Sequence, residues 1–442
     1  MEHSNQRRRL LKVFVASGAV TALSPFVWAG AAPQLRINPA RLQKSLEDLS
    51  VFGRPVGGTF ADGVSRFAYS DADIAGRKFA MSLIKAAGAE PRIDAAGNIR
   101  ALRAGRQPGL KSIMIGSHID SVPGGGNFDG ALGSMAAVEA LATLNEHHVV
   151  LRHPLEVVLW SNEEGGTIGS GLATGQSNAG VLEGTANGIR RLDGLKRIGG
   201  DATRLSEARI SRGNLAAYLE LHIEQSGLLE RAGVPIGVVD GIVAIDEYEV
   251  EIRGFANHAG TTPMADRKNA LLAAAKLIEA VQEEVTREPG RQVGTVGHLE
   301  VSPNARNVVP GLVKLTIELR DLDAGKIKAI GQRIRLRAEA VAIATQTQVT
   351  IKDGDDDPAA IATPALQRRI EQAASDLGLK TMHLPSGAGH DAANLAGVTD
   401  MGMIFVPSVK GISHSPHELT NWQDCANGAN VLLQTVLRID QL

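Results

Sequence analysis

Short apolar runs that end in histidine or carboxylate residues constrain this chain more than any other feature of its sequence. Three such runs occupy residues 113–118, 155–160 and 218–222. The first ends in His118 and the third in His222. The second is followed closely by Glu163 and Glu164. Runs of this kind are typical of buried strands that place polar side chains at one edge of a parallel sheet.

Segments with helical periodicity accompany these runs, at residues 38–49, 71–87 and 131–144. Strands that alternate with helices predict an α/β layered core. The chain has 442 residues, which suggests two or three domains. Its hydrophobic fraction of 43% and charged fraction of 21% are those of a globular protein.

The pattern changes from about residue 242. Residues 247–253 alternate between apolar and polar side chains, as a half-exposed strand does. Further elements are expected as helices at 269–285 and 327–344 and strands at 294–301, 311–319 and 349–352. This strand-helix-strand-strand-helix-strand order is ferredoxin-like. We therefore predict an inserted α/β domain at 242–354 within a catalytic domain formed by 32–241 and 355–442, and we interpret the acidic run 353–357 as a solvated linker.

The N-terminus is typical of an export signal. Arginines at 7–9 precede an apolar stretch at 13–28, and small residues follow at 29–31. The stretch is shorter than the roughly 20 residues that span a membrane, so no stable membrane anchor is expected. The adjacent arginines resemble a twin-arginine signal. The sequence thus predicts a signal peptide over 1–31 and a periplasmic or secreted protein.

Charge and cysteine content exclude several classes of protein. Lys and Arg number 46 against 48 Asp and Glu, a net charge of -2, so no nucleic-acid partner is expected. The single cysteine, Cys425, rules out an intramolecular disulfide and zinc sites built on several cysteines.

The polar residues at the strand ends suit a two-ion hydrolytic site. Asp120 lies two positions after His118, where its carboxylate could accept the second ring proton and fix the tautomer. Asp129 lies in a glycine-rich segment and could bridge two ions. The adjacent carboxylates of Glu163 and Glu164 repel each other unless one binds metal and the other serves as a general base. A phosphate loop, an exposed acidic turn and structural histidines are the alternatives.

Seven ordered motifs resemble one family. They are His118-x-Asp120 and residues 127–130, 161–165, 219–225, 257–264, 304–311 and 413–418. Together they resemble the amidase, hydantoinase and carbamoylase group of the dinuclear zinc aminoacylase-like hydrolases. The resemblance implies a mixed-sheet α/β metallohydrolase domain and an inserted ferredoxin-like lid that also forms a homodimer.

The resemblance also implies roles for individual residues. Ligands of two divalent metal ions would be His118, Asp129, Glu164, His222 and His414, with Asp129 bridging. Zinc is the first expectation, and manganese, cobalt or nickel suit the same ligands. Glu163 would be the general base, Asp120 would orient His118, and His258 of the lid would stabilise the oxyanion. Substrate contacts would come from Asn307, Arg320, Gly389 and His390, whereas His147, His148, His153, His298 and His383 match no motif.

The implied activity is hydrolysis of the linear C–N bond of N-carbamoyl-L-amino acids to amino acid, ammonia and carbon dioxide. Allantoate amidohydrolase, an aminoacylase or dipeptidase, and a metal-dependent binding protein without catalysis are the alternatives. Three departures from the group's pattern bear on substrate choice. Thr167 and Ile168 follow the acidic pair, Asp246 and Glu247 replace Gln-Arg, and Ser226 comes directly after Gln225.

Overall fold

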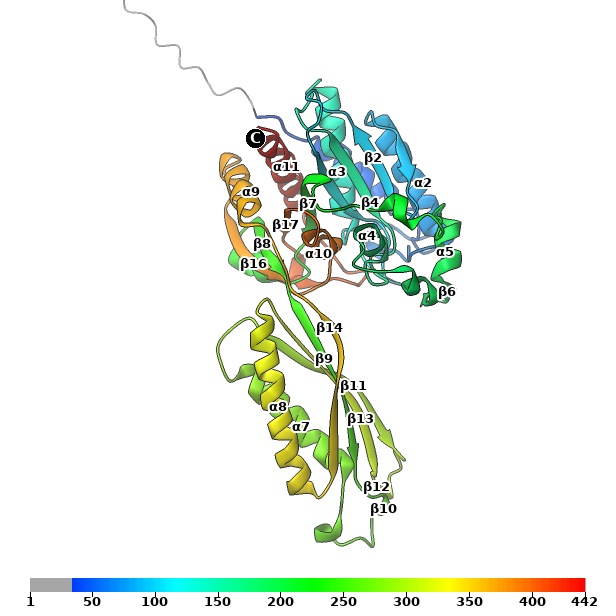
Figure 1. Cartoon of the computed structure of the whole chain (residues 1–442), viewed down its shortest axis with the longest axis vertical. Helices are drawn as coiled ribbons and strands as arrows, with labels where there is room; N and C mark the ends of the chain where they lie inside the picture. Colours follow the sequence, from blue (N-terminus) through cyan, green and yellow to red (C-terminus); the bar gives the residue numbers. More distant parts are fainter. Residues whose placement is uncertain (1–33, 442) are drawn as a thin grey trace, which may run out of the picture. The chain divides into compact units, whose positions relative to one another are not determined.

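The computed structural model describes residues 34–441 (Figure 1). The predicted signal at 1–31 lies outside these residues. Within 34–441, no helix has the length and apolar character needed to cross a bilayer.

A nine-stranded mixed sheet forms the larger part of the fold. Its strands are β1 (Pro91–Ile93), β2 (Ile99–Arg103), β3 (Ser112–His118), β4 (Leu155–Trp160), β7 (Leu215–Ile223), β8 (Ile236–Ile242), β15 (Ala360–Ile361), β16 (Thr381–Ser386) and β17 (Met401–Val406). They follow the order β1-β2-β4-β3-β7-β17-β8-β15, with β16 also paired to β8. The four central strands β4, β3, β7 and β17 are parallel, so their carboxyl ends meet at one edge. The predicted α/β core is thereby confirmed.

Nine helices belong to this part in the described residues. They are α1 (Pro39–Leu49), α2 (Asp71–Ala86), α3 (Ala131–Glu146), α4 (Ile168–Thr174), α5 (Arg191–Arg197), α6 (Leu228–Ala232), α9 (Pro364–Asp376), α10 (Asp391–Ala396) and α11 (Trp422–Ile439). A small hairpin joins β5 (Thr185–Ala186) to β6 (Ile189–Arg190). The helices predicted at 38–49, 71–87 and 131–144 correspond to α1, α2 and α3 within two residues at each end.

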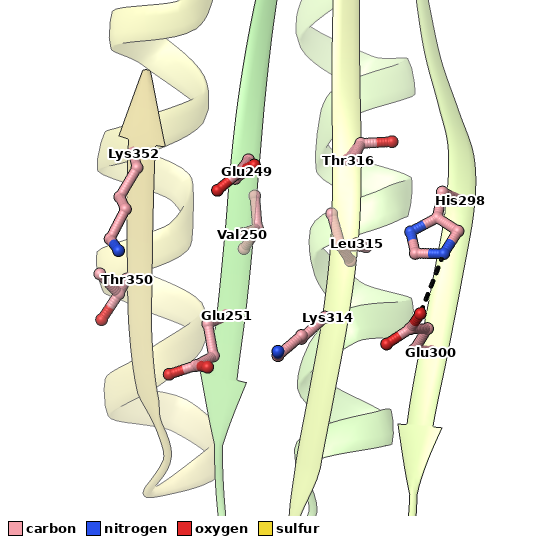
Figure 2. A pocket seen from close by; sticks show the side chains of 10 residues that line it. All are labelled: Glu249, Val250, Glu251, His298, Glu300, Lys314, Leu315, Thr316, Thr350 and Lys352. Carbon is pink, nitrogen blue, oxygen red and sulfur yellow. Dashed lines mark ion pairs between the residues drawn. The ribbon is translucent and has the colours of Figure 1, made fainter. Parts of the chain in front are cut away.

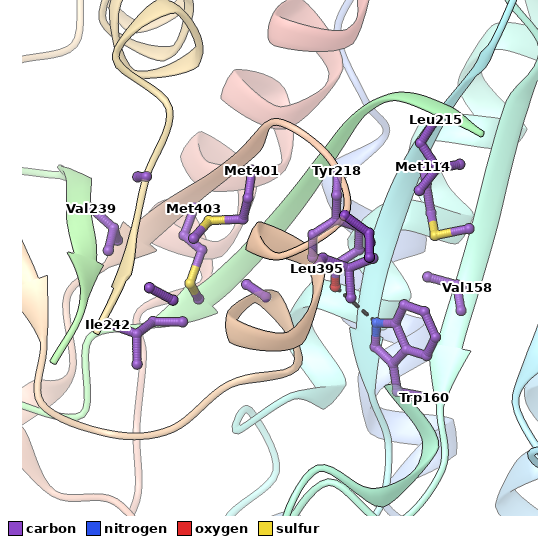
Figure 3. Packing of buried hydrophobic residues seen from close by; sticks show 14 of the residues in the cluster. Met114, Val158, Trp160, Leu215, Tyr218, Val239, Ile242, Leu395, Met401 and Met403 are labelled. Carbon is purple, nitrogen blue, oxygen red and sulfur yellow. Dashed lines mark hydrogen bonds between the residues drawn. The ribbon is translucent and has the colours of Figure 1, made fainter. Parts of the chain in front are cut away.

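Side chains of β7 point alternately to the two faces of the large sheet. Leu221 faces α3 and α11, whose glycines allow close approach to the strand. On the opposite face, Tyr218 packs in the apolar cluster of Figure 3. Its hydroxyl accepts a hydrogen bond from Trp160 Nε1 at 2.9 Å and donates one to Glu220 at 2.9 Å. Since side chains alternate along a strand, His222 lies on this same face, toward the carboxyl end.

Gly133 of α3 is expected to tolerate no side chain. A Cβ there would lie 2.0 Å from the Leu221 carbonyl oxygen of β7. Gly133→Ala must therefore push the helix off the sheet, and we expect it to cost about 1–3 kcal/mol of unfolding free energy. Urea unfolding measures this cost, with Gly297→Ala as control because no atom lies within 4 Å of a Cβ there. Equal midpoints for the two variants would contradict the close packing.

A second, four-stranded antiparallel sheet contains β9 (Ala244–Arg253), β11 (Val293–Ser302), β13 (Leu312–Asp321) and β14 (Gln348–Asp357) in the order β11-β13-β9-β14. Helices α7 (Ala270–Thr286) and α8 (Ala324–Thr345) pack on one face, with a core of their own. The element order is the predicted ferredoxin-like one. The other face is open and carries charged residues around a cavity of about 390 Å³, among them Glu249, Glu251 and Lys314 (Figure 2). We call this sheet with its two helices the four-stranded unit.

The interpretation of residues 353–357 as a linker is wrong. These residues continue β14, with Asp356 opposite Asp246 and Asp357 opposite Ile245 of β9. A register shift between Asp353 and Asp356 accommodates the run. Backbone pairing needs no apolar side chain, so exposed carboxylates can form the end of a strand. A short two-stranded antiparallel sheet of β10 (Asn257–His258) and β12 (Val308–Val309) completes this part.

Candidate active site

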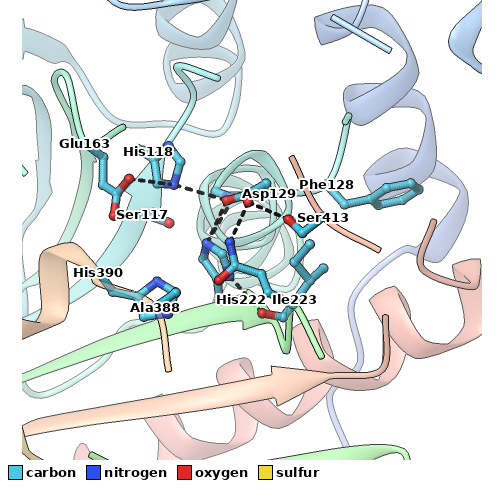
Figure 4. Close-up of polar contacts among 12 residues, drawn as sticks. Ser117, His118, Phe128, Asp129, Glu163, His222, Ile223, Ala388, His390 and Ser413 are labelled. Atoms are coloured by element: carbon cyan, nitrogen blue, oxygen red, sulfur yellow. Dashed lines mark hydrogen bonds and ion pairs between the residues drawn. The ribbon is translucent and has the colours of Figure 1, made fainter. Parts of the chain in front are cut away.

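Asp129 lies at the centre of the polar residues at the sheet edge (Figure 4). Its Oδ1 is 3.5 Å from His118 Nε2 and 3.2 Å from His222 Nε2. Its Oδ2 is 3.4 Å from His414 Nε2. Burial alone would raise the pKa of Asp129, but the three imidazoles outweigh it and hold that pKa well below its ordinary value. One oxygen of this buried carboxylate therefore faces His118 and His222, and the other faces His414.

The local sequence explains how Asp129 reaches this position. Gly130 follows it with φ of 60° and begins the turn into α3. A Cβ on Gly130 would lie 2.2 Å from His118 Nε2. Glycine is thus required there both by the backbone conformation and by the imidazole beside it.

The structure brings the five predicted metal ligands into two groups that share Asp129. One is His118, Asp129 and His222, and the other is Asp129, Glu164 and His414, with donor atoms in each group within 4.8 Å of one another. The Nε2 atom of His118 is buried and has no hydrogen-bond partner in the described part of the chain. A buried polar atom of this kind needs a partner, and imidazole with carboxylate suits divalent transition ions. These residues therefore fit a metal site.

Backbone carbonyls orient the two buried histidines. His118 Nδ1 lies 3.0 Å from the carbonyl oxygen of Asp120, and His222 Nδ1 lies 2.9 Å from that of Ile223. Each ring thus turns its Nε2 toward Asp129. The prediction assigned this role to the Asp120 carboxylate, whose Oδ1 is 3.7 Å from His118 Nδ1.

The Asp120 carboxylate instead holds the next loop. Its oxygens accept hydrogen bonds from the backbone N–H groups of Glu163 at 3.3 Å and Glu164 at 3.2 Å. The loop after β4 lies beside the end of β3 because the two strands are parallel neighbours. Asp120 therefore fixes the acidic pair relative to His118.

Glu163 and Glu164 occupy different environments. Glu163 is buried, with Oε2 3.6 Å from His118 Nε2, and burial raises its pKa well above the ordinary value, with Asp391 and Glu164 adding to the effect. Glu164 lies 3.5 Å from His414 Nε2, and burial together with Asp129 raises its pKa to about 7. A carboxyl group with a raised pKa can take up and release a proton near neutral pH.

Glu418 is a site residue to which the sequence analysis gave no role. It is buried and accepts hydrogen bonds from the backbone N–H groups of Phe128 at 2.9 Å and Asp129 at 3.0 Å. Ser413 donates to it at 2.9 Å and to Asp129 at 3.0 Å. Gln225 likewise donates to Asp129 at 2.6 Å. Gln225 and Glu418 are the last residues of the motifs at 219–225 and 413–418. Their place in these motifs was the only indication in the sequence that they belong to the site.

Glu418→Ala is expected to lower metal affinity or activity about 10- to 100-fold, because it frees the segment that carries Asp129. Metal titration followed by activity measurement tests this. Glu339→Ala on the exposed surface of α8 is the matched control. Wild-type metal affinity and activity in the Glu418 variant would show that the segment is held by other contacts.

A cavity of about 280 Å³ lies over these residues. Its lining includes Asp129, Glu163, Glu164, His222, Arg320, Gly389, His390 and His414. Arg320 reaches it from the end of β13 and donates a hydrogen bond to the Gly387 carbonyl at 2.7 Å. The cavity thus gathers three of the four predicted substrate contacts with four of the five predicted metal ligands.

Four predicted site residues do not line this cavity, namely His118, Asp120, His258 and Asn307. His258 is exposed on β10, where its Nδ1 accepts hydrogen bonds from the backbone of Gly260 at 3.1 Å and Thr261 at 3.2 Å. The Asn307 carbonyl accepts a hydrogen bond from Ala259 N at 2.9 Å, so His258 and Asn307 lie together at the β10–β12 pair.

Comparison with known proteins decides the family. Residues 114–438 match the model of Peptidase family M20/M25/M40. The chain belongs to this family. Within the M20/M25/M40 family, the protein is 38% identical to an N-carbamoyl-L-amino acid amidohydrolase of Geobacillus stearothermophilus over 411 residues, 92% of this chain and 99% of that protein. It is 33% identical to a ureidoglycolate hydrolase of Arabidopsis thaliana, over 92% of this chain and 88% of that protein.

The solved structures agree with this assignment. An amidase of the hydantoinase/carbamoylase family from Burkholderia multivorans matches with a TM-score of 0.85 and 34% identity, covering 92% of this chain and 99% of that one. The predicted resemblance to the amidase, hydantoinase and carbamoylase group is therefore confirmed.

Proposed function

We propose that this member of the M20/M25/M40 family is an amidohydrolase that cleaves N-carbamoyl-L-amino acids to amino acid, ammonia and carbon dioxide. The observation that carries the proposal is the shared carboxylate of Asp129 between two ligand groups, with Glu163 beside it in one cavity. The name of the Geobacillus relative supports this substrate class.

The proposed cofactor is a pair of divalent ions, zinc foremost, held by His118, Asp129, Glu164, His222 and His414. Such ions polarise a carbonyl and lower the pKa of water to about 7. Glu163 accepts the proton of the attacking water and passes it to the leaving nitrogen. Arg320 is suited to hold the substrate carboxylate through its planar guanidinium.

We also propose that His258 and Asn307 join substrate binding through the four-stranded unit, acting as a lid or from a homodimer partner. His258 would then stabilise the oxyanion. Cross-linking and light scattering of the protein with and without substrate test this. A monomer whose His258→Ala variant has full activity would contradict it.

The export signal remains a proposal supported by the sequence of residues 1–31. N-terminal sequencing of the protein recovered outside the cytoplasm tests it. A mature chain that still begins at Met1 would contradict cleavage.

The deciding experiment measures ammonia release after metal stripping and reloading with zinc, manganese, cobalt or nickel. Substrates are a panel of N-carbamoyl-L-amino acids, allantoate and ureidoglycolate, with N-acetyl-amino acids followed by free amine. Metal-dependent turnover of the carbamoyl panel supports the proposal. Turnover confined to another substrate would replace it with the corresponding activity.

A further inference from the structure

A second cavity adjoins the candidate active site. It has a volume of about 500 Å³ and shares a wall with the first cavity, formed by Gly166, Thr167 and residues 388–390. At Gly166 and Gly389, an added Cβ would meet no atom within 4 Å. The two glycines therefore leave open space at the shared wall, and a substrate in the first cavity can extend a side chain into the second cavity.

Part of the second cavity's lining outside the shared wall is acidic. Asp356 and Asp357 at the end of β14 line it. Within residues 34–441 neither carboxylate has an ion pair or a side-chain hydrogen bond, whereas Asp353 on the same strand is paired with Arg335 at 2.5 Å. Asp246 stands opposite Asp356 in the β9–β14 register but is buried outside the cavity lining.

A buried imidazole stands where the two cavities meet. His390 is 1% exposed, and its Nε2 lies 2.8 Å from the Ser386 hydroxyl. Its Nδ1 has no hydrogen-bond partner among the described residues, and its ring packs against that of His222 with centroids 4.4 Å apart. His390 lines both cavities, so a substrate that extends from the first into the second lies beside this imidazole.

The remaining lining matches the stem of a long side chain. Ile242, Val243 and Ile245 line the same cavity as the two free carboxylates and provide apolar surface there. A side chain with an aliphatic stem and a cationic head fits a cavity with both apolar and acidic lining. Such side chains bury the stem against apolar surface and keep the charged group at the polar end. A neutral side chain of equal length would leave the carboxylates without a counter-charge.

We propose that the second cavity selects substrates whose amino-acid side chain ends in a cation, such as the N-carbamoyl derivatives of lysine and arginine. The inference rests on the proposed function and names the substrate class within it. Asp356 and Asp357 determine specificity here and take no part in bond cleavage.

The test compares two substrates of matched stem, Nα-carbamoyl-L-lysine and N-carbamoyl-L-norleucine, by ammonia release from the metal-loaded enzyme. We expect kcat/KM to be about two- to fivefold higher for the lysine derivative, which corresponds to an exposed charge pair. The preference should fall as salt rises, because exposed charges are screened.

The Asp356→Asn, Asp357→Asn double variant should lose this preference and keep its rate on the norleucine derivative. Asp355→Asn is the matched control, since it removes a charge from the same strand outside the cavity lining. An equal preference in wild type and double variant, or a wild-type preference for norleucine, would overturn the inference. Failure to hydrolyse either substrate would instead count against the proposed function.

Discussion

Glu163→Gln is expected to lower kcat about 10²–10⁴-fold while leaving the fold and the metal content unchanged. The amide has the same shape as the carboxylate but cannot take a proton from water and return it to the leaving nitrogen. Glu163 belongs to neither ligand group that includes Asp129, so the ions should still bind. The effect should fall on kcat rather than on KM.

Three measurements distinguish this outcome from unfolding or metal loss. They are steady-state kinetics, metal analysis and the melting temperature of the purified variant. Glu339→Gln on the exposed surface of α8 controls for the substitution itself. A variant that keeps both ions and more than a tenth of wild-type kcat would remove Glu163 as the base.

Removal of the divalent ions should abolish hydrolysis and lower the melting temperature. A ligand present at about 100 times its Kd stabilises a folded protein by about 2.7 kcal/mol, and that contribution disappears with the ions. Without them, His118 Nε2 remains buried without a hydrogen-bond partner. Chelation, calorimetry and reloading with each metal measure the effect.

The Asp129→Asn substitution tests metal binding at a single residue. Because Asp129 belongs to both ligand groups, its loss should reduce binding of both ions, not of one alone. Metal analysis after equilibrium dialysis reports the stoichiometry, with the exposed Asp355→Asn as control. Two ions bound at wild-type affinity in the Asp129 variant would show that the groups do not share this carboxylate.

Much of the site could be predicted because its chemistry lies at the ends of strongly apolar strands. The run ending in His118 and the run preceding Glu163 are typical of buried strands, and parallel strands bring their ends to one edge. Glu418 could not be found this way. Its carboxylate accepts hydrogen bonds from backbone N–H groups 289 and 290 residues away in sequence. A contact between such distant residues produces no periodic pattern in the local sequence.

The sequence by itself determined the α/β core, the inserted ferredoxin-like element order and the residue types of a two-ion site, since periodicity and polarity are local properties. Only the tertiary structure decided which atoms of these residues contact one another. It turned the Asp120 carbonyl rather than its carboxylate toward His118 and placed Glu418 against the backbone N–H groups of Phe128 and Asp129. It also placed Asp356 and Asp357 of β14 in the lining of the cavity that adjoins the candidate active site. The reason is that direction and distance between side chains depend on how strands and loops far apart in sequence pack.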